Sequence, residues 1–239
     1  QLRVVPSSVS ARAGSTVPLT VYALRKDGFA DEITLSLKDA PEGFWLAGRQ
    51  LPAKENEVKI TLGVPSTSPK EPVSLKLEGR ATIQGRETVR SVVPAEDMMQ
   101  AFAYRHLVPS QELRVAVSGR DFGRRPVRIL SDGPTRIPAG GVASVTLAVP
   151  AGAPLDRISL ALSDPPEGIR IQKTTRSADG VEVFIQADAA KVKPGQKGNL
   201  ILTAAVKKPA TAGNKPRPAK QKAIPQLSLP AVPFEIIAP

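Results

Sequence analysis

The chain has 239 residues and a formal net charge of +11, from 33 Lys and Arg against 22 Asp and Glu, so its surface should attract polyanions at low salt. It contains no Cys and one His, which excludes disulfides, thiolate metal sites, Cys nucleophiles and multi-histidine metal sites. No apolar run approaches the ~18 residues that a membrane-spanning helix needs.

Short apolar runs follow one another from the N-terminus, separated by turns rich in Gly, Pro and Asp. Val17, Leu19 and Val21 alternate with other residues, which is the period of a half-buried strand. The pattern predicts strands in the first half at 2–5, 9–11, 16–23, 33–37, 44–46, 58–62, 73–77 and 88–93.

The second half repeats this order. Segment 33–43 (ITLSLKDAPEG) returns as 158–168 (ISLALSDPPEG), a strand that runs into an Asp-x-Pro-Glu-Gly turn. Further strands are predicted at 142–149, 158–162, 169–171, 181–187, 199–206 and 232–237. We therefore predict an all-β chain of two tandem immunoglobulin-like or fibronectin-III-like β-sandwich domains, at 1–93 and 113–239.

Residues 94–112 interrupt the strand pattern and are expected to link the two domains, in a form compatible with a short helix. Apolar side chains at helical spacing could bind a partner. Packing between the two sandwiches is the simpler role, and it would make the tandem a stiff rod. The residues expected at this interdomain contact are Met98, Met99, Phe102, Tyr104 and His106.

A second unusual segment, 207–222, has six basic residues and no acidic one, and is expected to form an enlarged hairpin loop. Its basic residues are Lys207, Lys208, Lys215, Arg217, Lys220 and Lys222. A solvated loop is the expected role, with weak and salt-sensitive attraction to polyanions as the alternative. The loop has no aromatic side chain on which bases could stack, so specific nucleic-acid binding is not expected.

The sequence carries no recognisable catalytic motif. No Gly-x-Ser-x-Gly element is present, and His106 has no partner motif to make it a general base. The acidic pairs Asp31-Glu32 and Glu96-Asp97 could supply oxygen ligands to Ca²⁺, but solvated carboxylates are the simpler interpretation. We expect neither an enzyme nor a bound cofactor or metal.

Carbohydrate binding is the main ligand-binding alternative, because an aromatic face stacks on a pyranose ring. The candidate rings are Trp45, Phe44, Tyr22 and Phe29. Neighbours on a strand face opposite ways, so Phe44 and Trp45 are expected to divide between the core and the surface. With one Trp in the chain, a platform of several rings is not favoured.

Three segments carry a family resemblance: RVVPSS at 3–8, VPLTVYALRKDGF at 17–29 and AEDMMQAFAYRHLVP at 95–109. With them the chain resembles the C-terminal tandem Ig-like region of large secreted proteins from planctomycete-type bacteria that carry a prepeptidase C-terminal domain. The resemblance implies an exported location (periplasm, cell surface or medium) within a larger polypeptide, and no particular activity.

These observations predict a non-catalytic tandem module of an exported protein, acting as spacer, scaffold or protein-interaction region. The alternative is a carbohydrate-binding accessory module of a larger secreted protein. The expected partner is a protein or polysaccharide of the cell envelope.

Overall fold

The computed structural model describes residues 1–100, 104–120, 127–131, 133–149, 158–178, 180–206 and 226–239. These residues form strands and turns and include no helix, so the all-β prediction is confirmed. Accordingly, the described residues include no helix that could cross a membrane.

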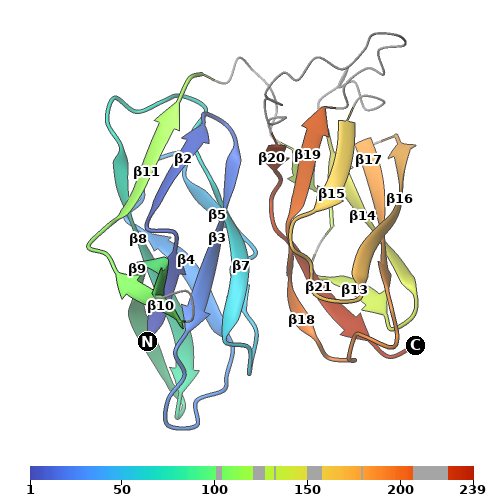
Figure 1. Cartoon of the computed structure of the whole chain (residues 1–239), viewed down its shortest axis with the longest axis horizontal. Coiled ribbons are helices and arrows are strands. Elements are labelled where there is room, and N and C mark those ends of the chain that lie inside the picture. The colour runs from blue at the N-terminus through green and yellow to red at the C-terminus, as the bar shows by residue number, and fades with distance from the viewer. Residues whose placement is uncertain (101–103, 121–126, 132, 150–157, 179, 207–225) are drawn as a thin grey trace.

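The strands fall into two groups that lie side by side (Figure 1). The N-terminal lobe holds β1 (Leu2–Val5), β2 (Ser8–Arg12), β3 (Thr16–Ala23), β4 (Ile33–Lys38), β5 (Trp45–Ala47), β6 (Gln50–Leu51), β7 (Glu57–Gly63), β8 (Val73–Ile83), β9 (Arg86–Gln100), β10 (Tyr104–Pro109) and β11 (Leu113–Ser118). The C-terminal lobe holds β12 (Arg128–Ile129), β13 (Thr135–Pro138), β14 (Val142–Ala148), β15 (Ile158–Leu162), β16 (Ile169–Ser177), β17 (Gly180–Ala187), β18 (Lys197–Leu200), β19 (Leu202–Val206), β20 (Gln226–Ser228) and β21 (Val232–Ile237).

Each lobe has its own hydrophobic core, built mainly from Leu, Ile and Val. Strand β3 shows why these sequences form strands: Leu19, Val21 and Ala23 are buried, while Thr20 and Tyr22 between them are only partly buried. Because side chains alternate along a strand, one face of β3 packs on the core of its lobe, and the opposite face is available for contact with the other lobe.

In the N-terminal lobe, β1, β3, β7 and β5 pair in that order, and β4, β8 and β9 pair in a second series. The first strand of the lobe is divided into β1 and β2, and the last strand is divided into β9 and β11. Thus β1 runs parallel to β9, whereas β2 runs parallel to β11. The C-terminal lobe repeats this pattern, with β12, β14, β17 and β16 in one series, β15, β19 and β20 in another, and β13 parallel to β21.

The repeated sequence motif has a repeated backbone. The φ angles are +49° at Asp39 and +43° at Asp164, and +89° at Gly43 and +86° at Gly168. Positive φ is uncommon for a residue with a side chain, although Asp tolerates it better than most. The duplicated turn in the sequence is therefore a duplicated turn in the structure.

The segment predicted as a linker is instead a β-hairpin inside the last strand of the N-terminal lobe. Strand β9 continues to Gln100 and pairs antiparallel with β10, and the Ser110 N–H donates to the Pro94 carbonyl at 2.8 Å where the hairpin begins and ends. The chain then re-enters the same lobe through β11, where Leu113 and Val115 are fully buried. The short helix is a wrong prediction because residues 95–100 and 104–109 pair as strands. The domain start at 113 is wrong because Leu113 and Val115 belong to the core of the N-terminal lobe.

Candidate functional site

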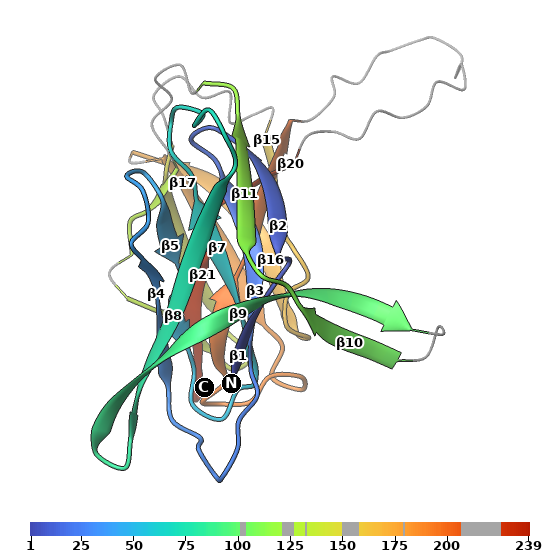
Figure 2. The ribbon, with the colours of Figure 1, turned by 90° about the vertical axis from the view of Figure 1, so that its left-hand side faces the viewer.

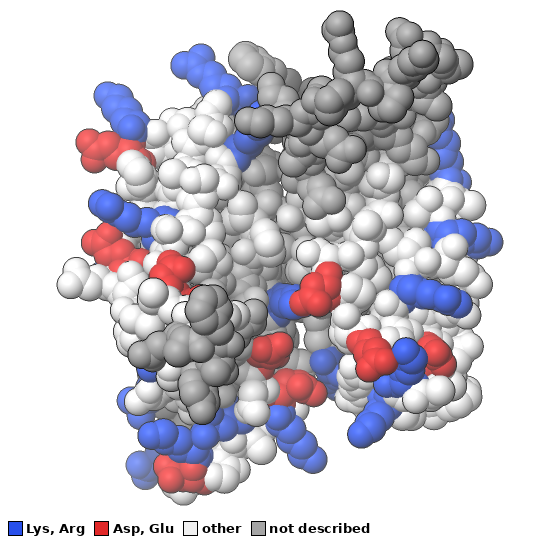
Figure 3. Space-filling view, in the orientation of Figure 1, with Lys and Arg blue, Asp and Glu red and all other residues white. Residues whose placement is uncertain are grey.

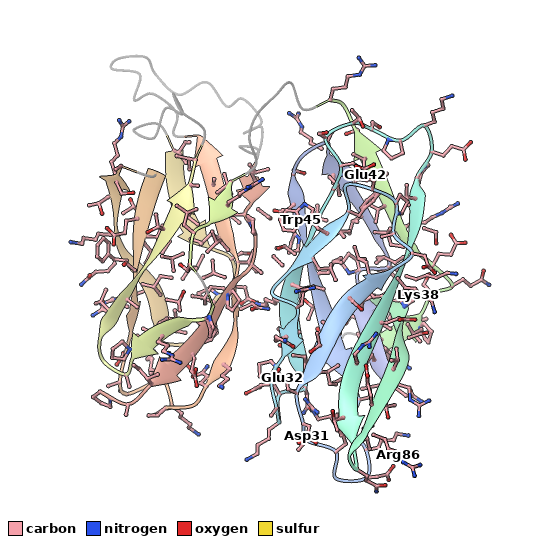
Figure 4. The ribbon with its side chains drawn as sticks, turned by 180° about the vertical axis from the view of Figure 1, so that it is seen from behind. Asp31, Glu32, Lys38, Glu42, Trp45 and Arg86 are labelled. Carbon is pink, nitrogen blue, oxygen red and sulfur yellow. The ribbon has the colours of Figure 1, made fainter. Side chains whose placement is uncertain are left out.

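Trp45 lies at the start of β5, on the border of the N-terminal lobe that faces the C-terminal lobe (Figure 4). Its side chain is 38% exposed, and its indole occupies the space that a side chain at Gly63 would fill on the adjacent strand. Phe44 turns inward and packs on the core. The expected division of these neighbours between core and surface is confirmed.

The other two candidate rings lie elsewhere. Tyr22 pairs with Glu57, whereas Trp45 pairs with Gly63, six residues further along β7 and thus about 20 Å away. Phe29 packs against the core and lies beneath the Arg25 guanidinium, 5.3 Å from the ring centroid. The four rings therefore do not form one platform.

The close fit of Trp45 over Gly63 predicts a specific effect of Gly63→Ala. A methyl group there would overlap the indole ring, so the ring should be displaced into solvent. Because Trp45 is the only tryptophan, its emission should shift to the red and acrylamide quenching should increase. Gly85→Ala, where an added Cβ meets no atom within 4 Å, is the control and should leave the spectrum unchanged. An unshifted spectrum in Gly63→Ala would contradict the predicted displacement.

The residues predicted to fill the interdomain contact lie on the β9–β10 hairpin, which projects sideways from the N-terminal lobe (Figure 2). Met98 and Met99 are 55% and 58% exposed, so they do not plug a junction between sandwiches. His106 is also exposed and pairs with Met98 across the hairpin. Phe102 and the side chain of Tyr104 lie outside the described residues.

The base of the hairpin is fixed by polar contacts with the divided first strand. The Ser7 N–H donates to Glu96 Oε1 at 3.0 Å, and the Ser7 hydroxyl donates to the same oxygen. Arg3 donates to the Leu107 carbonyl. Glu96 thus has a structural role.

The second acidic pair considered for Ca²⁺, Asp31-Glu32, lies near the lower end of the N-terminal lobe in Figure 4. The Asp31 carbonyl accepts a hydrogen bond from Arg25 at 2.8 Å. Among the described residues, no group of three His, Asp or Glu side chains is placed to hold a metal ion.

The contact between the lobes uses residues that the sequence patterns did not indicate. Asn199 of β18 is 8% exposed, and its side-chain amide donates to the Gly48 carbonyl at 2.7 Å and to the Lys59 carbonyl at 2.8 Å. Thr61 of β7 is fully buried, and its hydroxyl accepts the Ala231 N–H at 2.9 Å. These polar groups are buried, and each forms its hydrogen bonds with the other lobe.

A strand contact extends the same interface. Ser228 of β20 bridges to Thr16 of β3, and the Thr16 hydroxyl donates to the Ser228 carbonyl at 2.6 Å. In the N-terminal lobe, the corresponding strand β9 pairs with β1. In the C-terminal lobe, the edge of β20 pairs instead with β3 of the N-terminal lobe, so one sheet contains strands of both lobes.

The exposed margin of the interface carries an ion pair. Lys59 donates to the Asp164 carboxylate at 2.5 Å and to the Asp164 carbonyl at 2.6 Å. The hydrogen bond from Lys59, followed by its charge, lowers the pKa of Asp164 below the ordinary value of 3.8. The pair therefore favours the folded contact above that pH, and its contribution is lost as pH falls through the lowered pKa. Asp164 belongs to the duplicated turn.

The signal for this interface was weak in the sequence. Thr16 and Thr61 lie on the face of their strands opposite the core, where polar residues are ordinary, and only a buried partner makes them significant. Gly48 has a φ of +72°, and a side chain there would meet Asn199 and Ala231. In the sequence alone, a glycine in a turn does not indicate contact with another lobe.

The six basic residues at 207–222 lie outside the described residues. The strands on either side of the segment, β19 and β20, pair antiparallel, as expected for a hairpin. No known family model matches this chain, and no curated protein matches it significantly.

Proposed function

We propose that the chain is a non-catalytic module of an exported bacterial protein, in which two immunoglobulin-like β-sandwiches are locked side by side as a scaffold and protein-interaction region. The strand order supports the immunoglobulin-like assignment. The series β1-β3-β7-β5 and β4-β8-β9 correspond to the A-B-E-D and C-F-G sheets of constant-type immunoglobulin domains. The C-terminal lobe has the same pairing order, which supports a tandem duplication.

The observation that carries the scaffold proposal is the buried polar contact at Asn199 and Thr61. A buried donor or acceptor that loses its partner costs about 1–3 kcal/mol, so movement of one lobe against the other is penalised. Domains joined only by a flexible linker lack this constraint. The fixed contact supports a module that presents surfaces at set positions.

The arrangement favours a scaffold over a spacer. The two lobes lie side by side, and both chain termini lie toward the same end of the pair (Figures 1 and 2). A spacer gains length when the chain enters at one end and leaves at the other. This pair is about as long as one of its lobes, so it would add little reach.

The β9–β10 hairpin is the surface that such a scaffold would present. Met98, Met99 and Val108 are 55%, 58% and 43% exposed on it. A two-stranded ribbon is marginally stable alone, and exposed strand edges pair readily with other strands. We infer that the hairpin adds strands to the β-sheet edge of a partner protein.

Site-specific cross-linking tests this function. A photoreactive amino acid at position 99 in the exported protein should give discrete adducts with a partner protein at the cell envelope. The same residue at position 71, exposed on a turn of the same lobe, should not. Equal labelling at the two positions, or none at position 99, would overturn the interaction role. Met99→Lys should reduce adducts formed from a photoreactive residue at position 108.

The carbohydrate-binding alternative has less support in the N-terminal lobe. Trp45 is a single, partly exposed ring that already covers Gly63, and the other candidate rings lie away from it. A sugar site at Trp45 would have to use one ring only.

A further inference from the structure

The outer face of one sheet in the C-terminal lobe carries a cluster of charged and polar side chains. Along β17, Val183 and Ile185 point into the core, so Glu182, Phe184 and Gln186 point outward. Residues paired across strands share a face of the sheet. Cross-strand pairing therefore places residues of β16 and β14 beside this outward row.

Two basic side chains of β16 lie over this row. Arg170 pairs with Gln186, and its Nε and Nη2 atoms donate to the Gln186 Oε1 atom at 3.1 and 2.9 Å. Lys173 pairs with Phe184, and its ammonium lies 4.4 Å from the ring centroid. The two pairs are adjacent, because Phe184 and Gln186 are two residues apart on β17.

A surface depression of about 600 Å³ adjoins the Arg170–Gln186 pair. Its lining includes Gly140, Gly168, Arg170, Gln186, Asp188 and Lys191. Gly140 and Gly168 turn the backbone with φ of +80° and +86°, so part of the wall is main chain without side-chain bulk. The volume lies in the range of small-molecule sites.

Two basic side chains, Arg170 and Lys191, and one acidic side chain, Asp188, line the depression. Lys191 donates to Glu167 at 2.9 Å, and Asp188 accepts the Ala190 N–H at 3.0 Å through one of its two oxygens. Figure 3 shows several Lys and Arg side chains along the outer border of the C-terminal lobe, where Figure 1 places β16.

We propose that this depression binds a carboxylate-bearing sugar residue of an acidic polysaccharide. Arg170 donates two of its five N–H groups to Gln186, so the remaining three, on Nη1 and Nη2, can donate to a sugar carboxylate, and hydrogen bonds between two charged groups are the strong kind. Gln186 and Asp188 offer partners for sugar hydroxyls. This site is independent of the proposed hairpin interaction, since it lies on the other lobe.

The same surface is poorly suited to nucleic acid. Bases bind single-strand-binding proteins by stacking on open aromatic faces. The one aromatic ring of this cluster, Phe184, has the Lys173 ammonium over its face.

Calorimetric titration with an α-1,4-linked galacturonate oligomer at about 0.15 M salt tests the proposal, because generic attraction between exposed charges is largely screened there. The full chain should bind the oligomer and should not bind its methyl ester, in which esterification removes the negative charge. Arg170→Gln should weaken binding about tenfold or more. Gln186→Glu should do the same, because the added negative charge would neutralise Arg170 and repel the ligand.

Two controls separate this site from general charge. Arg136→Gln removes one exposed arginine of β13, and replacement of the six basic residues at 207–222 by Gln removes the basic loop. Both should change affinity less than threefold. Equal losses in Arg170→Gln and Arg136→Gln, tighter binding of single-stranded DNA, or equal binding of the methyl ester would overturn the proposal. None of these results would change the cross-linking expected at the hairpin, so the two proposals can fail separately.

Discussion

Phe234→Ala is expected to lower the free energy of unfolding of the C-terminal lobe by about 3–5 kcal/mol. Phe234 is 2% exposed in β21 and packs at the centre of that lobe's core. Removal of the ring takes away buried apolar area and leaves a cavity that the neighbouring strands can only partly close. Urea unfolding followed by far-UV circular dichroism measures the loss.

Phe184→Ala is the matched control, because it removes the same ring from the outer face of β17. That ring is only partly buried and contacts the Lys173 ammonium, so about 1–2 kcal/mol is expected from lost area and the cation–π contact. A loss in Phe234→Ala no larger than in Phe184→Ala would contradict the assignment of the core.

The strands could be predicted from the sequence because their signal is local. Val17, Leu19 and Val21 alternate within one run, and each alternation fixes which face is buried. The duplicated turn carried more information than any single strand, since Asp39 and Asp164 share a backbone conformation that few residues adopt. A repeated special turn implies a repeated framework around it.

The β9–β10 hairpin could not be predicted from local spacing of apolar residues. Met98 and Phe102 lie at helical spacing, and a short apolar segment between two repeats suggests a linker. A strand is selected here by its pairing, which joins Met98 to His106 and Glu96 to Val108 across the hairpin. Pairing of this kind is not visible in the spacing of apolar residues along one strand.

The contact between the lobes could not be predicted from local pattern. Asn199 meets residues 151 and 140 positions earlier, and Ser228 meets Thr16 across 212 positions. Every residue concerned is an ordinary polar or small residue at the sequence level. Their role follows only from how the two folded lobes fit together, which depends on the shape of both.

The second large effect is expected at that contact. In Asn199→Asp, a carboxylate of the same shape replaces the amide donor and faces the Gly48 and Lys59 carbonyls. The two carbonyls lose their partner at about 1–3 kcal/mol each, and the buried charge adds to the cost. We expect the lobes to separate while each lobe stays folded, because Asn199 lies outside both cores.

Spin labels measure the separation directly, since the chain has no Cys to compete with introduced ones. Ser74→Cys and Ser144→Cys place labels at exposed positions on different lobes. The distance between them should be narrowly distributed in the parent chain and broad in Asn199→Asp. An unchanged narrow distribution would show that the lobes are held by other contacts.

A pair of glycine variants separates loss of the interface from backbone strain. Gly48 and Gly28 have nearly equal φ angles of +72° and +73°, so Ala should strain the backbone similarly at both. Only at Gly48 would the added Cβ meet the other lobe, where it would overlap the Asn199 amide and lie 2.8 Å from the Ala231 Cβ. At Gly28 it meets no atom within 4 Å. Gly48→Ala should therefore broaden the distance distribution and Gly28→Ala should not, because only the former forces the two lobes apart.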